Sequence, residues 1–535
     1  MEKKTYAYEE AFKASLEYFA GDELAARVWV NKYAMKDSFG HIYECSPTDM
    51  HWRLTNELAR IERKYPNPVG EERIFEMLDH FRYIVPAGSP MTGIGNNFQI
   101  ASLSNCFVVG IDGDGDSYGA ILKLDEEQVQ LMKRRGGVGH DLSGIRPKGS
   151  PVKNSALTST GIVPFMERYS NSTREVAQDG RRGALMLSIS IRHPEAEDFI
   201  DAKMQEGKIT GANVSVKIDD EFMRCATEGL PYHQQFPIDS DKPIMEKETN
   251  AKALWKKIVH NAWKSAEPGV LFWDTIRRES IPDCYADLGF TTVSTNPCGE
   301  IPLCPYDSCR LLAINLYSYV EKPFTAEAFF NFDKFREHVT LAQRFMDDII
   351  DLEQEKIDAI IEKIKSDPQD NEVKLTELRL WEKIKHKTAQ GRRTGVGITA
   401  EGDMIAALGL RYGTEGHGNG RESATDAGPR RLPLEHGDGP RTRCVCRLRC
   451  EARGEQPLHS PHQGGRPRTL RGHAPLRPAQ HCLPHHRPHG HHEPHDADDE
   501  RHRTRVHAGL QAPPQGEPER PAGACGLYRR DGRCL

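Results

Sequence analysis

The chain has 535 residues, a formal net charge of -6 at pH 7 and a pI near 6.5. This length suffices for roughly two to four domains or one large barrel with additions, and the near-neutral charge excludes a broad basic surface for nucleic acid. The 13 cysteines, the lack of a leading signal segment and the lack of any apolar run near the ~20 residues that cross a bilayer predict a cytoplasmic protein with no membrane partner.

The first 90 residues are predicted to be helical. Apolar side chains recur at helical spacing from Tyr8 to Met35, with a break at Gly21-Asp22. The same pattern continues over residues 50–64 and 71–82. We therefore expect a helical N-terminal domain over residues 1–90.

The middle of the chain alternates between β-prone runs and segments with a helical pattern. Residues 101–110, 184–191 and 211–218 are apolar, β-prone runs. Helices are predicted over residues 194–204, 252–265 and 332–354. This alternation indicates an α/β architecture.

Four glycine-rich segments lie between these elements. Residues 111–118 are rich in Asp and Gly, but they lack the Glu at position 12 of a calcium loop, so no metal site is predicted. Residues 134–140 have the glycine density that lets a backbone approach a ligand, although a simple turn would look the same. Residues 145–151 and 177–184 combine glycine with basic side chains. For residues 177–184, a solvated basic turn is the alternative.

The segment from Ser294 to Leu303, here called the finger loop, carries an amide, a thiol and a carboxylate at alternate positions. In an extended backbone, Asn296, Cys298 and Glu300 would face one side together. Pro297 and Gly299 lie between them and disfavour an ordinary strand. A shaped loop facing one substrate is predicted, with a buried structural thiol beside a turn as the alternative.

The finger-loop sequence Asn-Pro-Cys-Gly-Glu-Ile-Pro-Leu resembles that of the large catalytic subunit of ribonucleotide reductases. The resemblance is strongest to the adenosylcobalamin-dependent class II branch. The resemblance runs from about Tyr8 to Glu415. It implies an α/β fold in which the helical N-terminal domain precedes a truncated ten-stranded α/β barrel over residues 91–415. The finger loop would pass through the centre of that barrel.

The resemblance also assigns roles to five residues. A carbon-bound ribose hydrogen cannot be removed as a proton, so Cys298 would act as a thiyl radical, with Glu300 as general base and Asn296 holding the substrate hydroxyl. Cys106 and Cys309 would be the dithiol pair that supplies two electrons by becoming a disulfide. From the residues alone, a buried strand cysteine is the favoured interpretation of Cys106. Cys304 is expected to be a packing residue, and a zinc site with Cys298 and Cys309 is disfavoured because the paired spacing is missing.

Two further sets of positions follow from the resemblance. Substrate would be bound by Ser89, Asn105 and Gly137. A deoxynucleotide effector would be bound by Asp116, Ser117, Arg146, Lys148, Gln178, Asp179, Gly180 and Arg181. The loop of residues 177–184 would lie between the effector and the substrate base. By favouring one state of this loop, an effector would change which substrate is chosen.

Residues 416–535 differ in composition from the rest. They contain no Ile, Lys, Met, Phe or Trp and hold 14 of the 23 histidines, so they are predicted to be disordered. Permitted codons for residues 480–506, read one nucleotide later, give a peptide containing PTGTTS, the phosphate loop of the family. We therefore expect an out-of-frame tail, and a histidine-rich metal tract is the disfavoured alternative.

The predicted function is reduction of ribonucleoside di- or triphosphates to deoxyribonucleotides for DNA synthesis, with adenosylcobalamin as cofactor. The expected partners are the ribonucleotide, a deoxynucleotide effector, a thioredoxin-like or other external reductant, and a second copy in a possible homodimer. The alternatives are a class I large subunit that needs a radical-generating small subunit, and an inactive nucleotide-binding fragment.

Overall fold

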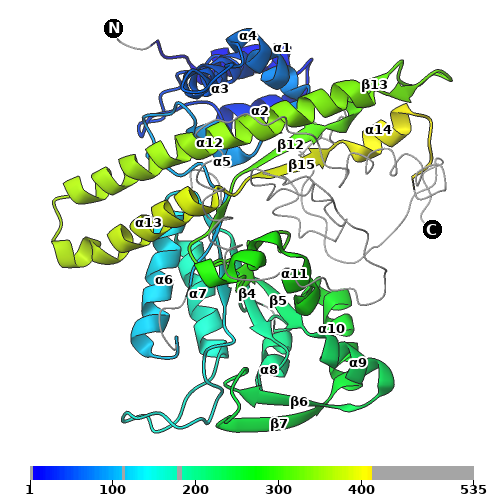
Figure 1. The fold of residues 1–535 in the computed structure, drawn as a ribbon. Helices are drawn as coiled ribbons and strands as arrows, with labels where there is room; N and C mark the ends of the chain where they lie inside the picture. Colours follow the sequence, from blue (N-terminus) through cyan, green and yellow to red (C-terminus); the bar gives the residue numbers. More distant parts are fainter. Residues whose placement is uncertain (1–3, 111–114, 177–182, 206, 413–535) are drawn as a thin grey trace, which may run out of the picture.

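The computed structural model describes residues 4–110, 115–176, 183–205 and 207–412 (Figure 1). The predicted effector residues Gln178, Asp179, Gly180 and Arg181 lie outside the described residues, as does the whole segment 416–535. In the part of the chain that the structure describes, no helix is long and apolar enough to cross a membrane.

The N-terminal residues form helices, as their periodicity predicts. The predicted break at Gly21-Asp22 falls where the Asp22 carboxylate caps the second helix by accepting a hydrogen bond from the Ala25 amide at 2.9 Å. The last predicted helix ends at Leu78, before a short 3-10 turn. These elements are α1 (Tyr8–Tyr18), α2 (Glu23–Lys32), α3 (Pro47–Glu62), α4 (Glu71–Leu78) and η1 (Asp79–Phe81).

A six-stranded sheet forms the lower body of the molecule in Figure 1, with strand order β11-β2-β3-β4-β5-β8. Neighbouring strands from β2 to β8 are parallel, and β11 pairs antiparallel with β2 at one edge. Its strands are β2 (Cys106–Val108), β3 (Gly137–Asp141), β4 (Leu185–Ser190), β5 (Asn213–Ile218), β8 (Gly269–Phe272) and β11 (Ser308–Cys309). The associated helices are α6 (Tyr118–Met132), α7 (Val163–Glu175), α8 (Ala196–Asp201), α9 (Asp220–Glu228), α10 (Ala251–Ser265) and α11 (Trp273–Glu279).

A three-stranded sheet of order β1-β12-β15 lies nearer the N-terminal helices. Strand β12 (Leu311–Asn315) is parallel to β15 (Gly395–Thr399) and antiparallel to β1 (Ile84–Pro86). Within the described residues, the two sheets remain separate, so a closed ten-stranded barrel is not formed. The other elements are α5 (Gly88–Gly93), β6 (Pro231–Phe236), β7 (Met245–Asn250), η2 (Ile281–Leu288), β9 (Ser294–Thr295), β10 (Pro302–Leu303), η3 (Leu316–Tyr319), β13 (Val320–Glu321), β14 (Phe329–Phe330), α13 (Asn371–Gly391) and α14 (Glu401–Ala407).

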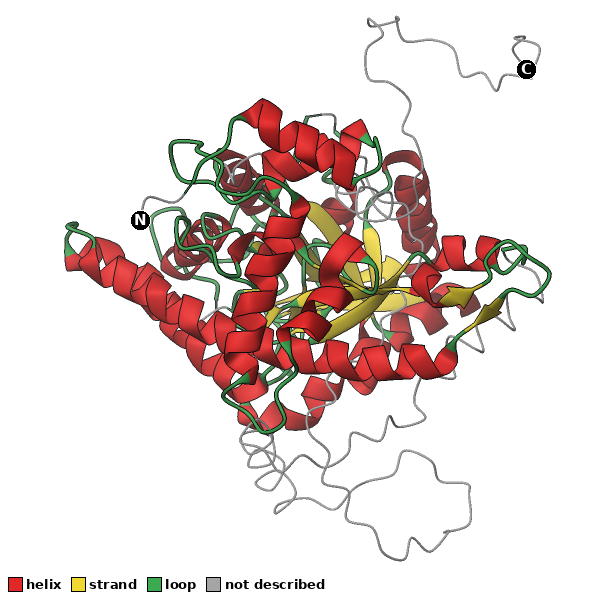
Figure 2. Cartoon of the chain, turned by 90° about the horizontal axis from the view of Figure 1, so that it is seen from above, coloured by secondary structure: helices red, strands yellow, loops and turns green. Residues whose placement is uncertain are grey.

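The long helix α12 (Phe332–Ser366) connects two hydrophobic cores. Its first half packs with the N-terminal helices and the three-stranded sheet, and its second half packs with the six-stranded sheet. We predicted that this helix ends at residue 354, which is wrong. The apolar stripe continues through Ile357, Ile360 and Ile364, all buried, and so carries the helix onward. Figure 2 shows the strands at the centre with helices around them.

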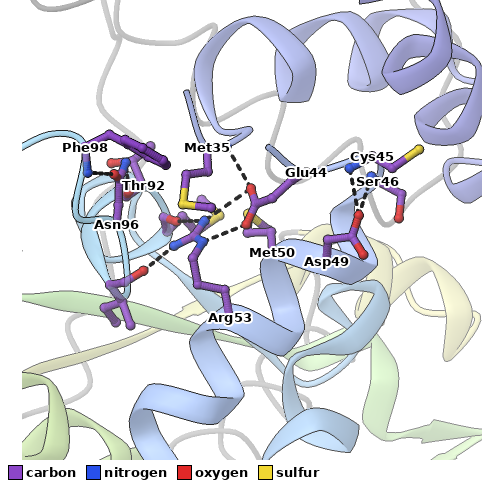
Figure 3. Close-up of polar contacts among 12 residues, drawn as sticks. Met35, Glu44, Cys45, Ser46, Asp49, Met50, Arg53, Thr92, Asn96 and Phe98 are labelled. Atoms are coloured by element: carbon purple, nitrogen blue, oxygen red, sulfur yellow. Dashed lines mark hydrogen bonds and ion pairs between the residues drawn. The ribbon is translucent and has the colours of Figure 1, made fainter. Parts of the chain in front are cut away.

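Helix α3 is tied to the segment that follows β1 by one arginine (Figure 3). The Arg53 guanidinium donates to the Glu44 carboxylate at 2.6 Å, to the Met91 carbonyl at 3.0 Å and to the Ile94 carbonyl. Because Met91 belongs to α5, this contact fixes the short helix that also carries Ser89. The N-terminal helices therefore help to position a predicted substrate residue.

Candidate active site

The finger loop is the turn between β9 and β10, and it has the shaped form that its proline and glycine predict. The Asn296 amide N–H donates to the Ile301 carbonyl at 3.1 Å, and the Asn296 side-chain oxygen accepts from the Ile301 amide at 2.9 Å. Gly299 has φ +85° and donates to the Asn296 carbonyl at 3.0 Å. Only glycine adopts that conformation at no steric cost, so the loop shape depends on it.

The glycines of residues 134–140 support the finger loop. A Cβ atom on Gly139 would lie 2.0 Å from the Thr295 carbonyl oxygen, and one on Gly137 would lie 2.8 Å from the Pro297 ring. The Asn213 side chain also donates to the Pro297 carbonyl at 3.0 Å. Two of the three glycines in this segment thus lie on strand β3 directly beneath the loop backbone, so a simple turn is the wrong description.

The two cysteines of the dithiol pair lie opposite each other on neighbouring strands. Cys309 on β11 is the register partner of Cys106 on β2, and both are free thiols. Opposite residues of antiparallel strands have Cα atoms about 4.5–5.5 Å apart, which lies within the range of about 4.4–6.8 Å that a disulfide spans. A disulfide can therefore close here without a change in backbone path.

The finger loop reaches the dithiol pair. The Asn296 side-chain N–H lies 3.8 Å from the Cys106 sulfur. The hydrogen bond with Cys309 raises the pKa of the Cys106 thiol well above its usual range, as do burial and the negative charge of Glu300. Two of the predicted catalytic residues, Asn296 and Glu300, thus lie beside the sulfur atoms of two others, Cys106 and Cys309.

The fifth residue, Cys298, lies at the exposed tip of the same loop. The Glu300 Oε2 atom is buried and has no hydrogen-bond partner among the described residues. Cys304 is fully buried, and its thiol donates to the Asp307 carboxylate at 3.6 Å. Burial raises the pKa of Cys304, so its environment is that of a protonated packing residue.

The three predicted substrate residues are linked through Asn105. Its side-chain oxygen accepts from the Ser89 amide at 3.0 Å, and its carbonyl accepts from the Gly137 amide at 2.7 Å. The Asn105 amide also donates to the Cys309 carbonyl at 3.0 Å. The Ser89 hydroxyl and the Asn105 side-chain N–H are buried without a partner in the described part of the chain, which leaves both for a ligand.

A separate cavity of about 980 Å³ contains three of the predicted effector residues, Asp116, Ser117 and Arg146. Arg146 forms an ion pair with Asp116 at 2.5 Å, and its amide donates to the same carboxylate at 2.9 Å. Ser117 caps α6 by accepting from the Ala120 amide at 3.2 Å. Lys148 is exposed and does not line the cavity.

Two buried charges beside the dithiol pair were not predicted. Glu353 on α12 accepts hydrogen bonds from the segment before Cys106, and Arg310 follows Cys309 directly. A charged residue inside the apolar run after Cys309 was a usable signal for Arg310. Glu353 gave no such signal, because glutamate is ordinary in a charged helix. Among the described residues, no group of three or more metal-binding side chains is present.

The chain matches the family description "Ribonucleotide reductase, barrel domain" over residues 104–425, which ends shortly after Glu415. It is 32% identical over 345 residues to a vitamin B12-dependent ribonucleoside-diphosphate reductase of Thermoplasma acidophilum, a match that covers 64% of this chain and 39% of that protein. A protein of the same name from Mycobacterium tuberculosis is 28% identical over 396 residues, a match that covers 73% of this chain and 51% of that protein. A vitamin B12-dependent ribonucleotide reductase of Streptomyces clavuligerus is 29% identical over 275 residues, a match that covers 46% of this chain and 27% of that protein. The chain thus spans about half the length, or less, of the curated relatives that it matches.

Proposed function

The chain belongs to the ribonucleotide reductase family, and from this premise we propose that it reduces ribonucleoside di- or triphosphates to 2'-deoxyribonucleotides for DNA synthesis. One observation carries the proposal. The structure brings Asn296, Glu300, Cys106 and Cys309 around a single point, with Cys298 on the same loop.

The first half of the proposed reaction activates the ribose. The sulfur radical of Cys298 takes the 3'-hydrogen atom of the substrate. Glu300 accepts the proton of the 3'-hydroxyl as general base, and its unpartnered buried Oε2 atom suits this role. Asn296 is held in place by its two hydrogen bonds to Ile301 and orients the substrate hydroxyl.

The second half removes the 2'-hydroxyl as water. Cys106 and Cys309 together supply two electrons and two protons, and their sulfurs join as a disulfide. The raised pKa of Cys106 keeps its proton available for the departing oxygen. Cys298 returns a hydrogen atom to C3' and is a radical again.

We propose adenosylcobalamin as the cofactor, in line with the names of the relatives. When bound, it would supply the one-electron chemistry that removes the Cys298 thiol hydrogen. The residues present fit such a group at one point, since the Cys298 thiol is exposed.

The remaining assignments are part of the same proposal. Ser89, Asn105 and Gly137 bind the ribonucleotide, and the cavity at Asp116, Ser117 and Arg146 receives the deoxynucleotide effector, to which Lys148 offers a further positive charge. An external dithiol such as a thioredoxin reduces the disulfide, and two copies form a dimer. The helical domain covers residues 1–90, and the truncated barrel domain covers residues 91–415.

The proposal is tested by incubating the full chain with a ribonucleoside triphosphate or diphosphate, adenosylcobalamin and dithiothreitol, and measuring deoxynucleotide formation. We expect Cys298→Ala to lower turnover by at least ~10³-fold. The matched control is Cys284→Ala, which removes another exposed cysteine and is expected to leave turnover unchanged. Turnover that persists in Cys298→Ala contradicts the proposed chemistry.

A second candidate is a nucleotide-binding protein without turnover, favoured by the cavity at Asp116, Ser117 and Arg146, which is separate from the finger loop. It predicts that the unsubstituted chain binds nucleotide in equilibrium dialysis while no deoxynucleotide forms. The class I alternative predicts turnover only after a radical-generating small subunit is added, without adenosylcobalamin.

A further inference from the structure

Strand β5 carries a buried lysine on the face opposite to the hydrophobic core. Val214, Val216 and Ile218 alternate along β5 and are buried in that core. Successive side chains of a strand point to opposite faces, so Ser215 and Lys217 lie on the other face. Both are only 5% exposed. Because lysine is almost never buried without a partner, Lys217 needs specific contacts on this face.

The Lys217 ammonium contacts an acid, a carbonyl and an aromatic ring. It forms an ion pair with Asp141 at 2.9 Å, donates to the Val293 carbonyl at 3.3 Å and lies 4.5 Å from the centre of the Trp273 ring. Val293 directly precedes β9, and its amide donates to the Leu303 carbonyl at 3.0 Å across the base of the finger loop. The lysine therefore holds the residue at which the two ends of the loop meet.

Asp141 supports a second contact to the same end of the loop. Its carboxylate accepts from the Ser188 hydroxyl at 3.3 Å, and the oxygen of that hydroxyl lies 3.0 Å from the Ser294 hydroxyl oxygen. Asp141 on β3 and Ser188 on β4 are register partners, which explains why the two side chains meet. Ser188 and Ser294 are both 0% exposed, so solvent does not compete for these contacts. One carboxylate thus organises the contacts to two consecutive residues, Val293 and Ser294.

The Asp141 carboxylate is itself held by the sheet. It accepts from the Ser143 hydroxyl at 2.9 Å, and the oxygen of that hydroxyl accepts from the Ser190 amide on β4 at 2.7 Å. The Asp141 side chain is 22% exposed and lines the cavity of about 980 Å³ described above. The base of the finger loop is therefore fastened to a rigid part of the molecule that also forms the wall of this cavity.

We propose that Lys217 and Asp141 are a positioning pair that fixes the base of the finger loop on the six-stranded sheet. Removing one partner of a buried ion pair leaves the other charge uncompensated, so either change alone releases the loop base. The effect of the pair on turnover rests on the proposed function, since Asn296, Cys298 and Glu300 follow this base in the chain. Its effect on the shape of the loop does not.

The test is hydrogen–deuterium exchange of the reduced full chain, measured by mass spectrometry of peptic peptides. The amides of Val293, Asn296 and Ile301 are hydrogen-bonded within the finger loop. Exchange over residues 293–301 therefore reports how often the loop opens. We expect Lys217→Met to speed this exchange about tenfold while exchange in helix α3 stays within about twofold.

Two further substitutions separate the charge of Lys217 from a general loss of stability. Lys217→Arg keeps the charge and should stay within about threefold of the unsubstituted exchange rate over residues 293–301. Lys257→Met is the matched control, because its ammonium pairs with Glu197 and Asp201 on α8, and it should leave this exchange unchanged. Unchanged exchange of the loop in Lys217→Met, or equal acceleration in α3, overturns the proposal.

A double variant tests whether the two residues act as a pair. When Lys217→Met is added to Asp141→Asn, exchange over residues 293–301 should rise by less than about threefold, since the ion pair is already broken. A full further tenfold rise would mean that the two residues act independently, and it overturns the pairing. If Lys217→Met alone does not fold, Asp141→Asn decides by the same comparison of the loop with α3.

The turnover assay distinguishes this proposal from the proposed function. In a chain that forms deoxynucleotide, Lys217→Met should lower kcat about 10²-fold while the KM for ribonucleotide stays within about threefold, because a displaced loop misplaces the reacting groups. An unchanged kcat overturns the role of the pair in the reaction. If the unsubstituted chain shows no turnover, the proposed function fails, and the exchange rates alone decide whether Lys217 and Asp141 position the loop.

Discussion

Gly139 lies on β3 beneath the finger loop, where a Cβ atom would fall 2.0 Å from the Thr295 carbonyl oxygen. That oxygen belongs to the backbone and cannot rotate away, so the loop itself would have to move. We predict that Gly139→Ala lowers the free energy of unfolding by about 3 kcal/mol, at the upper end of overpacking costs. Urea denaturation of the variant and the unsubstituted chain measures the difference.

The matched control is Gly402→Ala, in helix α14, where a Cβ atom would meet nothing within 4 Å. Because alanine favours helix, this variant should be unchanged or more stable by up to about 1 kcal/mol. Equal stability of the two alanine variants would show that the finger loop does not press on β3.

His193 makes stability depend on pH. It is fully buried, its Nε2–H donates to the Ile145 carbonyl at 2.9 Å, and burial lowers its pKa to about 4. Between the ordinary pKa near 6.5 and 4, the unfolded chain takes up a proton that the folded chain refuses, so stability falls as pH falls through this window. We predict that His193 accounts for a loss of about 2 kcal/mol in the free energy of unfolding between pH 7.5 and pH 5.

The contribution of His193 is isolated by comparing urea denaturation at the two pH values for His193→Gln and the unsubstituted chain. The variant should lose about 2 kcal/mol less on acidification, since glutamine keeps a donor but does not titrate. His233→Gln, at an exposed histidine, is the control. The assignment fails if His193→Gln and the unsubstituted chain lose the same free energy.

At the scale of elements, helix α12 holds the strand segment before Cys106 through one buried carboxylate. Glu353 is 0% exposed and accepts three hydrogen bonds from residues 102–104. Glu355, two positions later, points to solvent and pairs with Arg60 and Lys64. We predict that Glu353→Gln lowers the free energy of unfolding by about 2 kcal/mol or more, while Glu355→Gln changes it by less than about 1 kcal/mol.

The same pair of variants reports on the dithiol. In Glu353→Gln, the segment before β2 loses its anchor, so the fraction of chains that form the Cys106–Cys309 disulfide on mild oxidation should fall. In Glu355→Gln it should not. Mass spectrometry after alkylation of free thiols gives both fractions, and indistinguishable values would remove the assigned role from Glu353.

The spacing of apolar residues predicted where most helices and strands lie, but not which segments contact each other. The apolar runs at residues 184–191 and 211–218 became β4 and β5, and Gly21-Asp22 marked a true helix boundary. The sequence could not place Gly139 under Thr295 or Glu353 behind Cys106, because these contacts join segments far apart in the chain. The grouping of Asn296, Cys106 and Cys309 was expected from a resemblance and not from residue spacing, and their catalytic roles remain predictions.

At the scale of the whole molecule, α12 contributes side chains to both hydrophobic cores. A rigid helix shared by two cores couples their unfolding, so we predict one cooperative transition for the described part. Trp29 reports on one core and Trp381 on the other, and both are at most 2% exposed. Variants in which Trp29 or Trp381 is the only one retained of the six tryptophans should show urea midpoints within about 0.3 M of each other. Midpoints separated by about 1 M or more would mean that the two cores unfold independently.

The opposed positions of Cys106 and Cys309 across β2 and β11 have a consequence for crystallography. Since the disulfide closes within the existing backbone spacing, oxidation alters only side-chain torsions at that edge of the sheet. A crystal grown from reduced protein should then tolerate a soak in oxidant with its lattice and unit cell intact. Both redox states of the dithiol pair would be visible in one crystal form.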